Sequence, residues 1–242
     1  VQELLFAAFE NNTDDVKGAA ALALGRVAVG NRDAYLPLIT SRLEGETVEH
    51  QYSLLQSLRE VIVVGDLDAQ GTEKIMEMLY KQTDSAEEGV RNVVAECLGR
   101  LAAANPAQKV QELRERFTAA SSSALEKATL VSAVKFTVLS SEKGSLTKIR
   151  GELRLGDFFA AMSDADVNVR AAVVKTLNAV THRESTLVTP LMADILPVLL
   201  TQTAIVPELV RVMDLGAFKH TVDEGLDCRK AAFECVNTML DL

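Results

Sequence analysis

Residues 90–102 read VRNVVAECLGRLA, a stretch in which apolar or small side chains recur with a fixed spacing. Counted from Val90, they stand at steps of 0, 4, 7, 8 and 11 residues, at Val90, Val94, Cys97, Leu98 and Leu101. Because an α-helix completes a turn in about 3.6 residues, this spacing gathers these side chains on one face. The stretch therefore predicts an amphipathic helix with one buried face.

The same pattern returns along the chain. VKGAAALALGRVA opens at Val16, VRAAVVKTLNAVT at Val169 and CRKAAFECVNTML at Cys228, and weaker copies open at His50 and Glu126. Successive openings at 16, 50, 90, 126, 169 and 228 are 34, 40, 36, 43 and 59 residues apart. Repeats of two helices have periods of about 34 to 47 residues. The chain has no Trp for a tetratricopeptide signature, and its repeat length is irregular, so the HEAT type is favoured.

We therefore predict an all-α fold, a HEAT-repeat α-solenoid of about six helix pairs that forms a single domain over residues 1–242. One helix pair cannot bury its own apolar face, so each pair stacks on the next and the array becomes a curved rod. The 5 prolines and 13 glycines are too few for the many tight turns of an all-β fold. The long exposed surface of such a rod is suited to binding other proteins.

The helices that pair with these copies are predicted from two apolar segments. YLPLITSRL lies within Ala34–Leu43, and LVTPLMADILPVLL covers Leu187–Leu200. Pro37, Pro190 and Pro197 fall inside these segments, where a proline bends a helix because it has no N–H to donate. We expect the first helices of these pairs to be bent.

Capping boxes, in which Ser or Thr precedes Glu by three residues, predict helix starts at several places. They are Ser85 with Glu88, Ser123 with Glu126, and Thr221 with Glu224. In each, the hydroxyl of the first residue is expected to accept a hydrogen bond from a backbone N–H of the first helical turn.

A basic residue follows the opening position in most copies, at Lys17, Arg91, Lys127, Arg170 and Arg229. Such a row could be a cationic binding stripe, or a structural ladder that reaches the acidic turn of a neighbouring repeat. Asp15, Asp166 and Asp227 are placed to receive the basic side chains, so we favour the ladder. Each exposed pair of this kind contributes about 0 to 1 kcal/mol.

The last interval, 59 residues, is too long for a turn between helices and predicts an insertion at residues 205–226, between the helices of the last repeat. Its β-branched and aromatic residues flank Gly216, which favours a hairpin near residues 209–222. The strands would run from Leu209 to Asp214 and from Phe218 to Val222. The alternative is a short helix over Pro207–Met213 with Gly216 as its C-cap. Composition alone favours neither.

Charge and composition argue against several classes of function. The formal net charge of -9 repels the phosphate backbones of nucleic acids. No apolar run reaches the ~20 residues that cross a bilayer. No loop has the spacing of a phosphate-binding P-loop or of a dinucleotide fingerprint. We therefore expect no nucleic acid, membrane or small-molecule partner.

The residues that usually carry chemistry are scattered. His50, His182 and His220 belong to different repeats, so the sequence predicts neither a metal site nor a catalytic base. The odd number of cysteines favours a reducing intracellular setting over a disulfide framework. Cys228 and Cys235 lie seven residues apart on one helix face, where they are expected to pack between repeats, and Cys97 takes the place equivalent to Cys235. We expect no catalytic residue, no cofactor and no metal.

Specific strings add to this pattern. The strings are VKGAAALALGRVAVGNRDAYLPLI at 16–39, AEEGVRNVVAECLGRL at 86–101, DADVNVRAAVVKTLNA at 164–179 and FKHTVDEGLDCRKAAFEC at 218–235. With these strings the chain resembles the cullin-associated and neddylation-dissociated protein family, also described as TATA-binding-protein-interacting proteins. The resemblance extends over nearly the whole chain. It indicates that the chain is similar to part of the C-terminal HEAT region of that family. Ala217 departs from it, since a proline is expected there.

The resemblance implies a function without catalysis. Members of the family wrap around a cullin that lacks its ubiquitin-like modifier, together with the RING subunit of that cullin. A hairpin of their C-terminal repeats occupies the place of the substrate-receptor adaptor, which makes them exchange factors for SCF-type ubiquitin ligases. Carried onto this sequence, the partner-binding residues would be Val210, Arg211, Val212, Met213, Asp214, Leu215, Gly216, Ala217, Phe218, Lys219, His220 and Thr221.

Two expectations and one alternative follow from this interpretation. The resemblance implies a protein of the cytoplasm and nucleus, and it implies that the chain stops at Leu242, before the final repeats of the family. The start at Val1, without an initial Met, indicates a fragment of a longer chain. The alternative is another HEAT scaffold, such as a nuclear transport receptor or a phosphatase scaffold subunit. Binding to a small GTPase or to a phosphatase catalytic subunit, without binding to cullins, would distinguish that class.

Overall fold

The computed structural model describes residues 2–10, 13–45, 48–65, 67–214, 216 and 219–241. Its α-helices are α1 (Gln2–Ala7), α2 (Asp14–Gly30), α3 (Arg32–Gly45), α4 (Val48–Val64), α5 (Ala69–Tyr80), α6 (Glu88–Ala102), α7 (Pro106–Thr118), α8 (Ala124–Ser140), α9 (Arg150–Leu153), α10 (Leu155–Phe159), α11 (Val167–Glu184), α12 (Met192–Thr201) and α13 (Leu226–Leu240). Short 3-10 helices cover Ala8–Glu10, Leu146–Ile149, Ala160–Ser163, Ser185–Leu187, Thr189–Leu191 and Pro207–Leu209. The strands are β1 (Val210–Asp214) and β2 (Lys219–Asp223).

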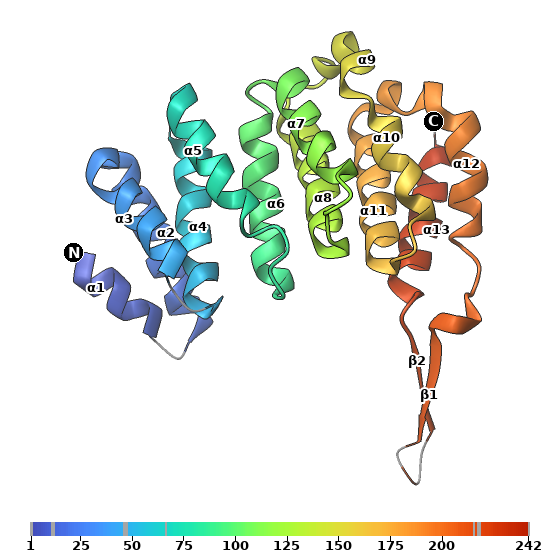
Figure 1. Ribbon diagram of the computed structural model, residues 1–242, viewed down its shortest axis with the longest axis horizontal. Coiled ribbons are helices and arrows are strands. Elements are labelled where there is room, and N and C mark those ends of the chain that lie inside the picture. The colour runs from blue at the N-terminus through green and yellow to red at the C-terminus, as the bar shows by residue number, and fades with distance from the viewer. Residues whose placement is uncertain are drawn as a thin grey trace.

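The predicted inner helices are all present, as α2, α4, α6, α8, α11 and α13. Each predicted opening, such as Val16 or Cys228, is the third residue of its helix. These helices pack in series, each one against the next along the chain, and form the inner layer of an elongated stack (Figure 1). The predicted all-α solenoid is thus confirmed.

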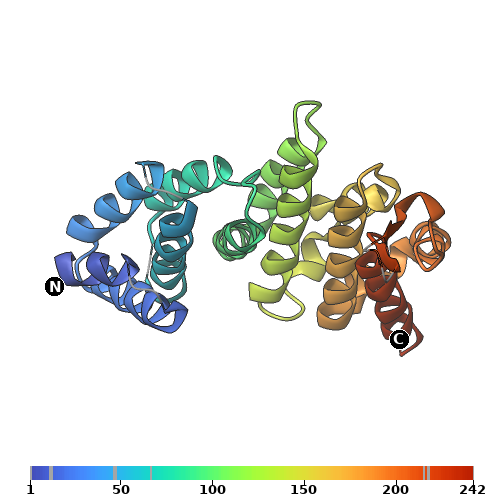
Figure 2. The ribbon, with the colours of Figure 1, turned by 90° about the horizontal axis from the view of Figure 1, so that it is seen from below.

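The remaining helices form the outer layer. Pairs are made by α1 with α2, α3 with α4, α5 with α6, α7 with α8, the short helix α10 with α11, and α12 with α13, while the short helix α9 packs against α7. Seen from below, the molecule is a rod with the two chain ends at opposite ends (Figure 2). In the described residues no single helix is long and apolar enough to cross a membrane; only the bent combination of Val167–Leu187 with Thr189–Thr201 passes, by length and composition alone.

One repeated position shows why the pairs stack. The fifth residue of the inner pattern is at most 6% exposed in every copy: Ala20, Leu54, Val94, Leu130, Val173 and Ala232. Five positions further on, Gly25 and Gly99 lie where α2 meets α4 and where α6 meets α8. A Cβ on Gly25 would lie 2.6 Å from the Ser57 carbonyl oxygen, so only glycine permits this close approach of two helices.

The capping predictions have mixed outcomes. Ser123 is the N-cap of α8, and its hydroxyl accepts a hydrogen bond from the Glu126 N–H at 3.1 Å, as predicted. The prediction at Ser85 is wrong, because α6 begins only at Glu88. Arg91 donates to the carbonyl oxygens of Ser85 and Ala86, at 2.6 and 2.9 Å, and so holds both residues outside the helix.

The third capping prediction fails for a different reason. Thr221 lies in β2, where it is paired with Val212, and α13 begins later, at Leu226 with Gly225 as its N-cap. Among the prolines, Pro37 and Pro197 lie inside α3 and α12 as expected. Pro190 instead lies in the first turn of a 3-10 helix ahead of α12, because the segment 187–200 is interrupted there.

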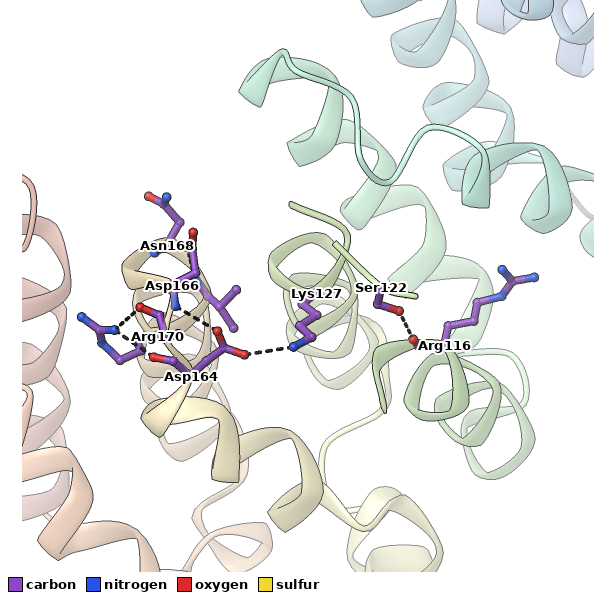
Figure 3. A network of polar contacts seen from close by, with 9 residues as sticks. Arg116, Ser122, Lys127, Asp164, Asp166, Asn168 and Arg170 are labelled. Atoms are coloured by element: carbon purple, nitrogen blue, oxygen red, sulfur yellow. Dashed lines mark hydrogen bonds and ion pairs between the residues drawn. The ribbon is translucent and has the colours of Figure 1, made fainter. Parts of the chain in front are cut away.

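The basic ladder is confirmed in part. Lys127 of α8 reaches the next repeat, where its Nζ lies 3.1 Å from the Asp164 carboxylate in the turn before α11 (Figure 3). Arg170 does not cross between repeats, since it donates to the carbonyl oxygens of Asp164 and Ala165 in the turn before its own helix. Asp166 was the predicted acceptor, but its carboxylate caps α11 through the N–H groups of Asn168 and Val169.

The same network shifts the pKa of Asp164. Burial alone would raise the pKa of this carboxyl, but the Asp166 N–H and the Lys127 ammonium stabilise its charged form, so the pKa lies below its usual range. Figure 3 also shows Ser122 donating to the Arg116 carbonyl at the end of α7, which shapes the turn into α8.

Ion pairs also join neighbouring repeats elsewhere. In the outer layer they connect Glu44 with Lys81, Glu73 with Lys109, and Arg114 with Asp157. In the inner layer they connect Arg26 with Glu60 and Arg59 with Glu96. Lys109 is buried, which would lower its pKa, but its contacts with Glu73 and Glu112 outweigh this effect and raise the pKa. Pairing between repeats is therefore general, while the residues that carry it vary.

Candidate functional site

The candidate site is the β-hairpin between α12 and α13. After α12 the chain makes the 3-10 turn Pro207–Leu209 and enters β1, which pairs antiparallel with β2. The register places Arg211 opposite Val222 and Met213 opposite His220. The hairpin points away from the helical stack, beyond the ends of the helices (Figure 1). It is thus a projection whose two faces are not covered by the described helices.

The predicted hairpin is confirmed, with boundaries close to those expected. The first strand begins at Val210, one residue later than predicted, and the second extends to Asp223. Of the alternative helix over Pro207–Met213, only the 3-10 turn Pro207–Leu209 is present, and it begins with the proline. Gly216 has a φ of 82°, a conformation that glycine adopts readily, so the turn is placed where it was predicted. Leu215, Ala217 and Phe218, and the side chain of Asp214, lie outside the described residues.

Apolar side chains are exposed on both faces of the hairpin. Val212 is 61% exposed and Met213 is 48% exposed. Because neighbouring residues of a strand point to opposite faces, each face carries one of them. Arg211, Lys219, His220 and Thr221 are also exposed. Amphipathic surfaces of this kind favour contact with another protein.

The base of the hairpin is tied to α13. The Glu224 N–H donates to the Leu209 carbonyl at 3.0 Å and closes the ladder below the described strand pairs. The Asp223 carboxylate accepts from the Gly225 N–H at 2.9 Å and forms an ion pair with Arg229, which is largely buried. These contacts fix the direction in which the hairpin leaves the stack.

Replacing Arg229 with alanine is expected to loosen the hairpin, because Asp223 then loses its buried partner. Hydrogen exchange of the β1 and β2 amides should become about tenfold faster. The matched control is Arg211→Ala, which removes the exposed ion pair with Glu224 and should change exchange by less than about twofold. Equal exchange rates in the wild type and the Arg229 variant would show that this pair does not hold the hairpin.

The three cysteines, together with His50 and His182, lie in the helical stack. Cys97, Cys228 and Cys235 are buried between helices as free thiols. Burial raises the pKa of Cys235 to about 12, so this thiol is not activated. His182 contacts Thr238 at 3.0 Å, and His50 contacts Glu10 at 3.2 Å. Within the described parts of the chain, no group of three or more His, Cys, Asp or Glu residues could hold a metal ion.

Comparison with known proteins adds a relationship over the whole chain. The family model described as TATA-binding protein interacting (TIP20) matches residues 187–242, which include the hairpin. Cullin-associated NEDD8-dissociated protein 1 of Arabidopsis thaliana is 41% identical over 100% of this chain. The protein of that name from Drosophila melanogaster is 38% identical over 99% of the chain. The chain is homologous to the cullin-associated NEDD8-dissociated proteins.

The chain corresponds to only part of these relatives. It spans about a fifth of their length, 20% of the Arabidopsis protein and 19% of the Drosophila protein. A relative from Emericella nidulans, named cullin-associated NEDD8-dissociated protein 1, C-terminal part, is 34% identical and covers 96% of the chain, which spans 22% of that relative. This name agrees with the predicted place of the chain in the C-terminal HEAT region.

Likeness to solved structures is weaker. An engineered protein is 13% identical with a TM-score of 0.48, and covers 99% of this chain and 98% of its own. A designed armadillo repeat protein is 15% identical with a TM-score of 0.43, and covers 98% of both chains. Because both TM-scores lie below 0.5, the repeat architecture rests on the helix stacking described above.

Several residues that define the hairpin were not among the partner-binding residues predicted from the sequence. Ile205 is 65% exposed just before the 3-10 turn and extends the apolar surface toward the base. Asp223, Glu224 and Arg229 fix the base. The sequence placed Arg229 in the same basic row as Arg170, but the predicted acceptor was Asp227, whereas the structure pairs Arg229 with Asp223 at the end of β2.

Proposed function

We propose that the chain is part of a non-enzymatic scaffold that binds cullin–RING complexes lacking the ubiquitin-like modifier. In this proposal the hairpin competes with the adaptor of the substrate receptor, and the protein thereby exchanges receptors on SCF-type ubiquitin ligases. In this proposal the protein acts in the cytoplasm and the nucleus. Imaging of a fluorescent fusion expressed at its native level tests this localisation. Restriction of that fusion to one compartment would contradict the proposed localisation.

One observation carries the proposal. The hairpin projects from the helical stack, and it exposes Val212 and Met213 rather than burying them. It lies within the segment that matches the family model, in a chain whose relatives are named for their association with cullins. A projecting apolar strand pair gains stability when a partner covers it. Shape and burial, rather than chemistry, would then supply the binding energy.

The test is competition between the full-length protein and an adaptor for a purified, unmodified cullin–RING complex. We expect Val212→Asp with Met213→Asp to weaken displacement of the adaptor by about thirtyfold, because two apolar contacts are replaced by buried charges. Deletion of residues 211–221 should have an effect at least as large. The matched control is Val63→Asp on α4, a site 49% exposed and remote from the hairpin, which should leave competition unchanged.

The outcomes separate the parts of the proposal. Binding to the cullin with equal displacement of the adaptor by wild type and hairpin variants would remove the hairpin from the mechanism. Failure of the wild-type protein to bind any unmodified cullin–RING complex would contradict the proposed function as a whole.

A further inference from the structure

A groove of about 470 Å³ runs along the inner layer, over α6, α8, α11 and the start of α13. These inner helices lie side by side (Figure 1). Asp223 and Glu224, at the base of the hairpin, are among the residues that line the groove. Its lining is mostly polar, and includes Asn92, Thr129, Ser132, Lys135, Asn168 and Lys175. The surface therefore suits a polar or charged ligand better than an apolar one.

Three basic side chains on the preceding inner helices are paired with carboxylates of this chain. Arg26 of α2 pairs with Glu60 of α4. Arg59 of α4 and Arg100 of α6 share the Glu96 carboxylate, at 3.4 and 2.9 Å. Up to α6, each of these basic side chains on the inner layer thus has an acidic partner in the same or the next repeat.

The pattern changes at α8 and α11. Lys135 of α8 and Lys175 of α11 line the same groove, and neither forms an ion pair with a described carboxylate. The Lys135 ammonium lies over the Phe136 ring, 4.5 Å from its centroid, and the side chain is partly buried. Burial and the positive charge of Lys175 both lower the pKa of Lys135, and no carboxylate offsets them. Two ammonium groups thus line one groove, and neither has a described carboxylate as an ion-pair partner.

The acidic residues that line the groove either form ion pairs with arginines of this chain or lie in the first turn of a helix. Asp223 pairs with Arg229, and Glu224 pairs with Arg211. Glu88 and Asp227 lie in the first turns of α6 and α13, where the helix dipole stabilises negative charge. Lys135 and Lys175 lie further along their helices, about eight residues or more from the helix starts, which corresponds to at least about 12 Å of rise. The two lysines therefore form a separate cationic centre in a protein of net charge -9.

We propose that Lys135 and Lys175 bind a carboxylate-rich segment of the protein partner. The inference rests on the proposed scaffold function and adds the chemistry of a second contact, on the inner layer rather than on the exposed strands of the hairpin. A partner carboxylate between the two ammonium groups would remove their mutual repulsion and replace the missing counter-charge. The neighbouring Ser132, Asn92 and Asn168 side chains supply hydrogen-bonding groups around it.

The test is the affinity of the full-length protein for the unmodified cullin–RING complex. Lys135→Glu with Lys175→Glu should raise Kd by about tenfold or more at physiological ionic strength, and should flatten the dependence of Kd on salt. The matched control is Lys74→Glu with Lys148→Glu, which changes the net charge equally at two exposed lysines outside the groove. Thermal denaturation of both variants checks that each remains folded.

A chemical readout identifies the contact directly. A carbodiimide joins an amine to a carboxylate only when the two groups touch, so treatment of the complex should link Lys135 or Lys175 to an Asp or Glu of the partner. Tight binding of wild type and double variant alike, or cross-links at other lysines but not at these two, would overturn the inference while leaving the proposed function intact. Failure of the wild type to bind the complex would overturn both.

Discussion

Replacing Gly99 with alanine is expected to lower the free energy of unfolding by about 3 kcal/mol or more. The added Cβ would overlap the Ala133 carbonyl oxygen and the Phe136 Cβ, and would lie 2.8 Å from the Thr137 nitrogen. Two of these atoms belong to the backbone of α8 and cannot rotate away. The helices α6 and α8 would have to separate, which weakens packing along the centre of the stack. Urea denaturation followed by circular dichroism measures the loss.

The same substitution at Gly18 is the matched control. A Cβ on Gly18 would meet no atom within 4 Å, and the residue lies within α2. Alanine should therefore stabilise the protein by about 0.5 to 1 kcal/mol, because it restricts the unfolded chain and favours the helix. Equal effects at the two glycines would show that the close approach at Gly99 does not limit the packing of α6 against α8.

Replacing Phe158 with alanine is expected to destabilise the protein by about 3 to 5 kcal/mol. This ring is fully buried in the short helix α10, and its centroid lies 5.1 Å from that of Phe117 in α7. The outer layer consists of two short helices here, because Arg154 takes a left-handed conformation, with φ 46°, and separates α9 from α10. No long helix is present to close over the cavity that alanine would leave.

Phe233 provides the matched control, because the same side chain is removed at an exposed position. It is 60% exposed on α13, so Phe233→Ala should change the free energy of unfolding by less than about 0.5 kcal/mol. In a stack of repeats each pair is stabilised mainly by its neighbours, so unfolding in the Phe158 variant should begin locally. Hydrogen exchange should accelerate first in α7, α10 and α11. A uniform acceleration over the whole chain would contradict this local account.

The inner layer could be predicted from the sequence because its signal repeats. Val94, Leu130 and Val173 occupy equivalent positions, and each copy supports the assignment of the others. The outer layer carries no such repetition. The break at Arg154 and the 3-10 turn at Pro190 depend on contacts with neighbouring helices, which a pattern of single residues does not contain.

Polar contacts were harder to predict than burial. The partner of Lys127 is Asp164 rather than Asp166, because Asp166 is already used as the N-cap of α11. Two acceptors that lie two residues apart cannot be distinguished before the geometry of the turn is known. The cationic centre at Lys135 and Lys175 was missed for a similar reason, since the lysines are 40 residues apart in sequence and line one groove only because α8 packs against α11.

The hairpin was predicted from the length of an interval, and its direction follows from where it is attached. Both strands emerge between α12 and α13, and Arg229 ties them to the second of these helices. Five residues of strand extend about 17 Å, so the hairpin acts as a lever arm on the last helix pair. A change of about 10° in the angle between α13 and α11 would displace the tip by about 3 Å, because displacement grows with the length of the arm. The twist of the rod thus sets the position of the far ends of the two strands, and bending of repeats far from the hairpin would move them.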